Sequence, residues 1–269
     1  TLSVTYDNTS PSVVVSTTAT SPTSVTPIPV TFTFSEAVTG FVLGDITVTN
    51  GTAGNFVAVS TTVYTASITP TATGTVTVSV IAGVAQDAAT NNNLASNVLS
   101  VNFDNSRPTV VVSSTAVSPT SVSPIPVTIT FNKAVTGFIL GDITVTNGTA
   151  GTFTAVSSTV YTVNVTPTAN GVVSVSVAAG VAQDALANTN LASNTLSLTF
   201  DNTRPTVVVS TTATSPTLIT PIPVTFTFNE AVTGFIVTDI TATNGTVGNF
   251  VAVSPTVYTA SVTPTANGA

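Results

Sequence analysis

Apolar and polar residues alternate along most of the chain, with Val, Ile or Phe at every second position and Thr or Ser between them. In residues 28–34, for example, Val30, Phe32 and Phe34 lie on one face and threonines on the other. This period of two predicts half-buried β-strands, and no stretch of useful length has the period of a helix. The sequence therefore predicts an all-β protein.

The alternating pattern recurs at a fixed step of 97 residues. Asp7, Asp104 and Asp201 lie one step apart, and the segments that begin at Pro27 and Pro124 both read PIPV. Such a period indicates a tandem array of similar folding units. We interpret the chain as a window on a longer array. The expected domains are 1–8, the last strand of a preceding truncated repeat; 9–105, the first repeat; 106–202, the second; and 203–269, a third that lacks its last two strands.

Turn signals divide the first repeat into seven short strands. The expected strands are 12–16, 28–34, 45–49, 55–60, 63–69, 75–80 and 97–103. Asn50-Gly51 predicts a hairpin between the third and fourth strands, because both residues tolerate positive φ. Seven short strands in a unit of this size match an immunoglobulin-like sandwich. The linker to the next repeat is short and contains Pro108, so we expect a linear rod of roughly 35–45 Å per repeat.

The composition excludes several functional classes. The 269 residues include no Cys, His, Met or Trp, so thiol or His-dependent catalysis, His or Cys metal sites and disulfides are excluded. Three basic residues against ten acidic ones give a net charge of -7, and three cations cannot neutralise a nucleic-acid backbone. The mean hydropathy is +0.54, yet no apolar stretch is long enough to span a membrane.

Four segments of the chain carry a resemblance to a known family. They read TFTFSEAVTGFVLGDITVTNGT, VYTASITPTATGTVTVSV, AGVAQDAATNNNLASNVLSVNFDN and the junction DNTSP. They closely resemble the bacterial Ig-like repeats that build the stalks of very large secreted adhesins. The resemblance covers essentially the whole chain and implies a non-enzymatic filament on the bacterial cell surface, with no required cofactor. In its low charge and near-identical copies the chain also resembles the giant mobile adhesin of gliding Bacteroidetes. This resemblance implies motility machinery as a partner.

The acidic residues are the only clustered chemistry. Asp7 lies on the incoming linker, Glu36 and Asp45 follow the second strand, and Asp87 lies in the loop before the last strand. In a sandwich of this topology these segments share one end, so the carboxylates should gather at the interdomain junction. Oxygen ligands without sulfur or imidazole suit Ca²⁺. The candidate ligands are Asp7, Asp45 and Asp87 in the first repeat and Asp104, Asp142 and Asp184 in the second, with Asn91, Asn92 and Asn93 as further carbonyl donors.

A purely structural interpretation of these residues stays open. Asp87 can cap a turn, and Asp45 can start a strand from a tight loop. Tyr64 and its counterparts in the other repeats could stack on sugars, but Tyr64 alternates with Ala66 and Ile68, which favours packing in the core.

The second junction differs from the first in its charges. Lys133 replaces Glu36, and Arg107 lies beside the linker. A salt bridge to Asp104 or Asp184 would hold this junction together without a metal.

Three functional hypotheses follow. The first is a stalk segment of a surface adhesin, with neighbouring repeats, a cell-surface anchor and an external surface or ligand as partners. The second is a module whose loops bind carbohydrate or protein. The third is a self-associating fibre of a biofilm matrix, formed through sheet edges or lateral faces.

Overall fold

The computed structural model describes residues 1–269 and contains β-strands and three single 3-10 turns, with no α-helix. The first repeat contains β1 (Val13–Ser16), β2 (Ile28–Phe34), η1 (Leu43–Asp45), β3 (Ile46–Thr49), β4 (Gly51–Ala58), β5 (Val63–Pro70), β6 (Gly74–Val80) and β7 (Leu99–Phe103). The second contains β8 (Val110–Ser114), β9 (Ile125–Phe131), η2 (Leu140–Asp142), β10 (Ile143–Thr146), β11 (Gly148–Ala155), β12 (Val160–Pro167), β13 (Gly171–Val177) and β14 (Leu196–Phe200). The third contains β15 (Val207–Ser210), β16 (Ile222–Phe228), η3 (Val237–Asp239), β17 (Gly245–Ala252) and β18 (Val257–Pro264).

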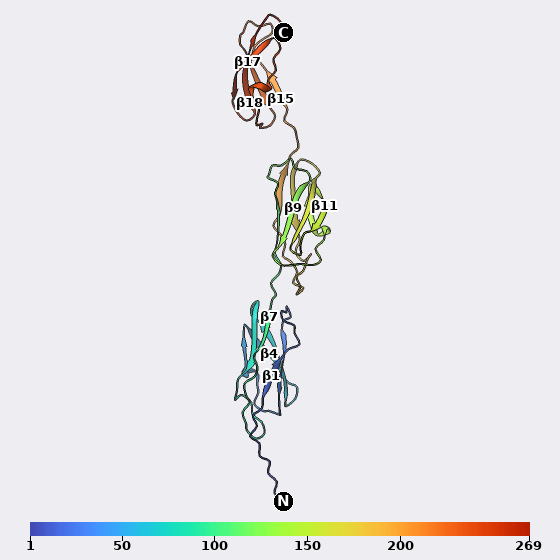
Figure 1. Ribbon diagram of the computed structural model, residues 1–269, viewed down its shortest axis with the longest axis vertical. Helices are drawn as coiled ribbons and strands as arrows, with labels where there is room; N and C mark the ends of the chain where they lie inside the picture. Colours follow the sequence, from blue (N-terminus) through green and yellow to red (C-terminus); the bar gives the residue numbers. More distant parts are fainter. The chain divides into compact units, whose positions relative to one another are not determined.

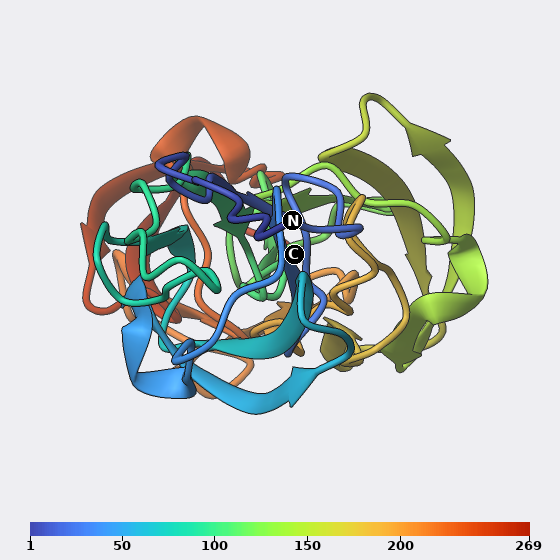
Figure 2. The same ribbon diagram turned by 90° about the horizontal axis from the view of Figure 1, so that it is seen from below.

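Each of the first two repeats is a sandwich of two antiparallel sheets. In the first repeat the sheet orders are β1-β2-β5-β4 and β3-β6-β7, and the second repeat has the same orders one step along. Figure 1 labels β1, β4 and β7 in the first repeat, and Figure 2 shows the three 3-10 turns as short coils in blue, lime and orange-red. This arrangement confirms the predicted immunoglobulin-like fold. No helical segment is long or apolar enough to cross a membrane.

The alternation along the strands determines which side chains form the core. Val30, Phe32 and Phe34 on β2 are buried, and Val76 and Val78 on β6 face them from the opposite sheet. The threonines between them lie outside this core and keep the β propensity of the strand without charge.

The tyrosine of each repeat belongs to the core. Tyr64 is buried, and its hydroxyl donates to the carbonyl of Val38 at 3.1 Å. Its ring lies 5.2 Å from that of Phe41 and is stacked on Phe56 at 5.7 Å. Tyr161 and Tyr258 make the corresponding contacts. The core interpretation of these residues is therefore confirmed, and each aromatic pair adds about 0.5–1.5 kcal/mol beyond the area it buries.

The hairpin predicted at Asn50-Gly51 is wrong. β3 pairs with β6 and β4 pairs with β5, so Asn50 connects two different sheets. It adopts φ 53°, and its side chain donates to the carbonyl of Ala72 at 2.9 Å, which fixes the turn between β5 and β6. β4 begins at Gly51, earlier than predicted. A Cβ at this position would lie only 3.0 Å from the carbonyl oxygen of Thr69, so glycine permits the close approach of the two strands.

Three of the four edge strands of the first repeat, β1, β4 and β7, are protected. The amide of Asn97 binds the backbone N–H and C=O of Val15, the residue that would otherwise pair with another strand, at 2.9 and 3.0 Å. On β4 the register shifts after Gly54, where Asn55 adopts φ 51°. Thr23 lies along β7 and donates its N–H to Asn102 at 2.9 Å. Blocked or bulged edges oppose edge-to-edge pairing with another chain.

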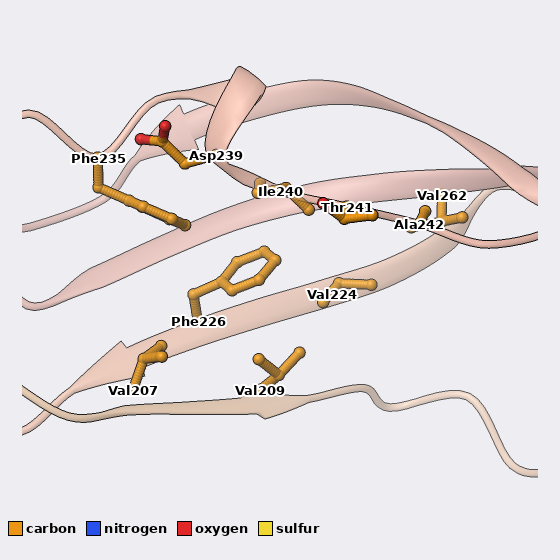
Figure 3. Close-up of a pocket in the computed structure, with 10 residues that line it drawn as sticks. All are labelled: Val207, Val209, Val224, Phe226, Phe235, Asp239, Ile240, Thr241, Ala242 and Val262. Carbon is orange, nitrogen blue, oxygen red and sulfur yellow. The ribbon is translucent and has the colours of Figure 1, made fainter.

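The third repeat forms a separate compact unit, residues 201–269, and has one sheet, β15-β16-β18-β17. The described residues contain no counterpart of β6 and β7. Val207 and Val209 are therefore 46% and 59% exposed, whereas Val13 and Val15 are 4% and 2% exposed. The uncovered core face of the third repeat forms an apolar hollow of about 410 Å³. Figure 3 shows Phe226 at the centre of the side chains that line it. The comparison shows that one sheet buries its core face only against the other.

Candidate metal centre

Three segments bring carboxylates together at one end of the first repeat. Asp7 comes from the segment before β1, Glu36 from the loop after β2, and Asp87 from the loop between β6 and β7. One oxygen from each lies within 4.8 Å of the others, and the three range from exposed (Asp7) to buried (Asp87). The structure thus brings together three of the four carboxylates expected to gather here: Asp7 and Asp87, which were predicted as ligands, and Glu36.

Asp87 is held in place by its own loop. Its Oδ1 accepts from the backbone N–H groups of Ala89 and Asn91, both at 2.8 Å, and its Oδ2 accepts from Nδ2 of Asn91 at 2.8 Å. The hydrogen bond from the Asn91 side chain, with the backbone donors, holds the pKa of Asp87 below its usual value against the opposing effect of burial. Asn91 also donates to the backbone carbonyl of Asp7 at 3.3 Å and so fastens the incoming segment to this loop.

Glu36 lacks comparable compensation. Partial burial raises its pKa, and the neighbouring charges of Asp87 and Asp7 raise it further. Three ionised carboxylates this close repel one another unless a cation lies between them. Calcium is bound by 6–8 oxygen ligands, including carboxylates and backbone carbonyls, so this set of donors fits such an ion in chemical type.

The other candidate ligands are used elsewhere. Asp45 turns back on its own 3-10 turn, where its Oδ2 accepts from the N–H of Val42 at 2.8 Å, and Asp142 binds Ile139 in the same way. Both therefore lie outside the carboxylate clusters. Asn93 is buried, and its Oδ1 accepts from two backbone N–H groups of its own loop.

Asn92 and Asn91 are also engaged. Oδ1 of Asn92 accepts from Nε2 of Gln86 at 2.9 Å. Asn91 presents its NH₂ group to Asp87. In this structure the three asparagines therefore stabilise the loop that positions Asp87.

At the second repeat an ammonium group occupies the corresponding cluster. Nζ of Lys133 lies 2.8 Å from Oδ2 of Asp104 and 3.3 Å from Oδ2 of Asp184. It also donates to the backbone carbonyl of Ser106 at 2.8 Å. Lys133 and Ser106 together hold the pKa of Asp104 down to about 2. The predicted salt bridge is confirmed, and it ties the segment that follows β7 to the loops of the second repeat.

Arg107 takes no part in this salt bridge. Its Nε donates to the carbonyl of Thr189 at 2.7 Å and its Nη2 to that of Asn190 at 2.7 Å. These two hydrogen bonds hold Arg107 against the loop between β13 and β14. Sequence reasoning missed this role, for which the recurrence of the arginine one step later, as Arg204, was the available signal. It also missed the part of Ser106.

In the third repeat the corresponding acids are Asp201 and Glu230. The N–H of Thr203 donates to Asp201 at 2.9 Å and lowers its pKa. Oε1 of Glu230 is buried and has no hydrogen-bond partner. The described residues contain no counterpart of Asp87, so in the third repeat they include two of the three corresponding carboxylates.

A family model described as a bacterial Ig-like domain matches the chain three times, at residues 7–103, 104–200 and 201–269. A search of the curated proteins finds no match.

Several solved structures are similar at low identity. InvD of Yersinia pseudotuberculosis is 17% identical, with 82% of this chain and 69% of that chain covered and a TM-score of 0.32. Invasin, described as a bacterial integrin-binding protein, is 15% identical, with 96% and 55% covered and a TM-score of 0.34. The glucan-utilisation protein SGBP-B of Bacteroides ovatus, solved with a mixed-linkage heptasaccharide, is 16% identical, with 73% and 46% covered and a TM-score of 0.23. The chain spans about half the length of the last two.

Proposed function

The chain belongs to the bacterial Ig-like domain family, and we propose that it is a non-enzymatic stalk segment of a long adhesin on the bacterial cell surface. One observation carries the proposal: similar Ig-like units follow one another at a constant step, and the short linker before the second repeat is fastened to that repeat. Domains of this family are typically structural or adhesive modules. The proposed partners are the neighbouring repeats, a surface anchor or motility machinery, and an external surface. Gliding would be one use of such a filament.

Single-molecule stretching tests the mechanical part of the proposal. Each complete repeat should unfold as one event, because it has its own core. An unfolded repeat of 97 residues extends to roughly 320–350 Å, so the two complete repeats should give two steps of nearly equal length, somewhat shorter than this. A single unfolding event for both repeats would contradict a stalk of independently folded domains.

Antibody labelling of intact cells tests the location. An antibody raised against residues 106–202 should label unpermeabilised cells, and mild external protease should remove the signal. Labelling that requires permeabilised cells would contradict the surface assignment. Small-angle scattering of the purified chain provides a separate test of the rod: we expect about 35–45 Å per complete repeat, and a compact profile would count against it.

The proposal includes a divalent cation, with calcium as the candidate, bound by Asp7, Glu36 and Asp87. The three clustered carboxylates and the raised pKa of Glu36 support it. Calcium that binds only the folded state raises the melting temperature by mass action. The first repeat should therefore melt several degrees higher in calcium than in chelator. Identical melting curves in calcium, magnesium and chelator would remove the cation from the proposal.

The self-associating fibre is the weaker alternative. The blocked edge at Val15, the bulge after Gly54 and the cover that Thr23 gives to β7 all oppose lateral pairing of strands. We expect the chain to remain monomeric at high concentration in analytical ultracentrifugation. Saturable binding on a glycan array would instead favour the binding-module alternative.

A further inference from the structure

The loops at the N-terminal ends of the first and second repeats hold their aspartates in the same way. Asn91 donates to Asp87 at 2.8 Å and to the backbone carbonyl of Asp7 at 3.3 Å. In the second repeat the corresponding donor is Asn188, which donates to the side chain of Asp184 at 3.1 Å and to the carbonyl of Asp104 at 3.2 Å. The loops thus place two carboxylates alike, and a difference between them must come from a third side chain.

That third side chain is Glu36 in the first repeat and Lys133 in the second. In the second repeat a cation lies between the paired aspartates, because Nζ of Lys133 is 2.8 Å from Asp104 and 3.3 Å from Asp184. The equivalent carboxylates therefore bind a positive charge where the chain itself supplies one. In the first repeat the chain supplies a third carboxylate instead.

We infer that Lys133 is a tethered cation, which takes the place in the second repeat of the divalent ion that Asp7, Glu36 and Asp87 bind in the first. The inference rests on the cation in the proposed function and adds which residue determines whether a repeat needs a free divalent ion. The N-terminal end of the first repeat responds to the concentration of divalent cations. The N-terminal end of the second is held by the ion pairs of Lys133 at any concentration of divalent cations.

The net charge of each cluster explains why one position can decide whether the cluster needs a free divalent ion. Three ionised carboxylates carry three negative charges, and a divalent cation reduces the total to one. Asp104, Asp184 and Lys133 already sum to one negative charge, the same total without a free ion. A further divalent ion near Lys133 would face the repulsion of its ammonium group and would have only two carboxylates as ligands.

A reciprocal exchange in the full chain tests the inference. The variants are Glu36→Lys and Lys133→Glu, with calcium chloride as the probe. Calorimetry counts the sites, and the backbone amide signals of Asn91 and Asn188 locate them. In the unaltered chain, calcium should shift the amide signal of Asn91 and leave that of Asn188 unchanged. Glu36→Lys should abolish that site, and Lys133→Glu should create one that shifts the signal of Asn188.

Two further variants sharpen the test. Lys133→Met removes the ammonium without adding a carboxylate, so it should bind calcium more weakly than Lys133→Glu. Glu36→Lys should also raise the stability of the first repeat in chelator, because the new cation pairs with the aspartates; this readout holds even if Lys133→Glu folds poorly. Asp45→Asn is the matched control, since Asp45 is a loop carboxylate outside the cluster, and it should leave calcium binding unchanged.

The outcomes separate the inference from the proposed function. If the unaltered chain binds calcium at the first repeat but Glu36→Lys still binds it, or folded Lys133→Glu gains no site, the inference is wrong and the stalk is untouched. If no variant binds calcium, both the inference and the cation in the proposed function are wrong. The stretching and labelling experiments use no calcium response, so they judge the stalk independently.

Discussion

The N-terminal ends of the first and second repeats have one backbone design and opposite electrostatics. Asp87 and Asp184 are held by the same hydrogen bonds from their loops. Glu36 adds repulsion to the first cluster, whereas Lys133 neutralises the second. The comparison teaches that the fold fixes where the carboxylates lie, while one side chain at a loop position sets the net charge of the cluster.

Removing the tethered cation should have the largest effect on stability. Lys133→Met leaves Asp104 and Asp184 facing each other, and Asp184 is only 8% exposed. A lost charged hydrogen bond costs about 1.5–3 kcal/mol, so with the partial exposure of Lys133 we expect the second repeat to lose about 1–2 kcal/mol. Hydrogen exchange at Val112 in low urea measures this loss for the second repeat alone.

The first repeat provides the control for that measurement. Exchange at Val15 should not change in Lys133→Met, since each complete repeat has its own core. An equal loss at both valines would mean that the two repeats unfold together, and the comparison between two separate carboxylate clusters would fail.

The corresponding change in the first repeat should act in the opposite direction and be smaller. Glu36→Gln removes one of three neighbouring negative charges, so in chelator the first repeat should become more stable. The gain should be smaller than the loss in Lys133→Met, because the change relieves repulsion and breaks no charged hydrogen bond. In calcium the same variant should lose the stabilisation that the ion gives. Destabilisation in chelator would show that Glu36 makes a favourable contact and does not merely repel its neighbours.

Acid should also separate the two carboxylate clusters. The pKa of Asp104 is lowered to about 2, so its pair with Lys133 contributes its full stability above the ordinary value of 3.8. That stability is lost as the pH falls from there through about 2. The pKa of Glu36 is raised, so lowering the pH through it neutralises Glu36 and relieves repulsion. Carboxyl NMR titration should therefore give pKa shifts of opposite sign for the two residues, downward for Asp104 and upward for Glu36.

The sequence predicted the sandwich and only part of the candidate site, for physical reasons. Strand faces follow from a local period, so Val30 and Phe32 were placed correctly in the core. The partner of a strand is a long-range choice, which is why Asn50 was mistaken for a hairpin residue although it joins two sheets. Asp45 was misplaced for the opposite reason, since a contact only three residues away captures its carboxylate.

The cluster of the second repeat was easier to interpret than that of the first. Lys133 differs in charge from its counterpart, and a change of sign beside two carboxylates predicts a salt bridge whatever the exact loop geometry. The role of Ser106 depends on which way its backbone carbonyl points, and a repeated sequence does not encode that direction in any single position.

Salt should have the smallest effect and still distinguish the first cluster from the second. Raising sodium chloride from about 0.05 to about 0.5 M shortens the screening length from above 10 Å to a few ångströms. The Lys133–Asp104 pair is about a quarter to a third exposed, so the second repeat should lose roughly a few tenths of a kcal/mol. In chelator the first repeat should gain stability, because screening weakens repulsion among Asp7, Glu36 and Asp87. Exchange at Val15 and Val112 in one sample measures both; a change of the same sign in each would mean that salt acts on the sandwich in general and not on the charges at its N-terminal end.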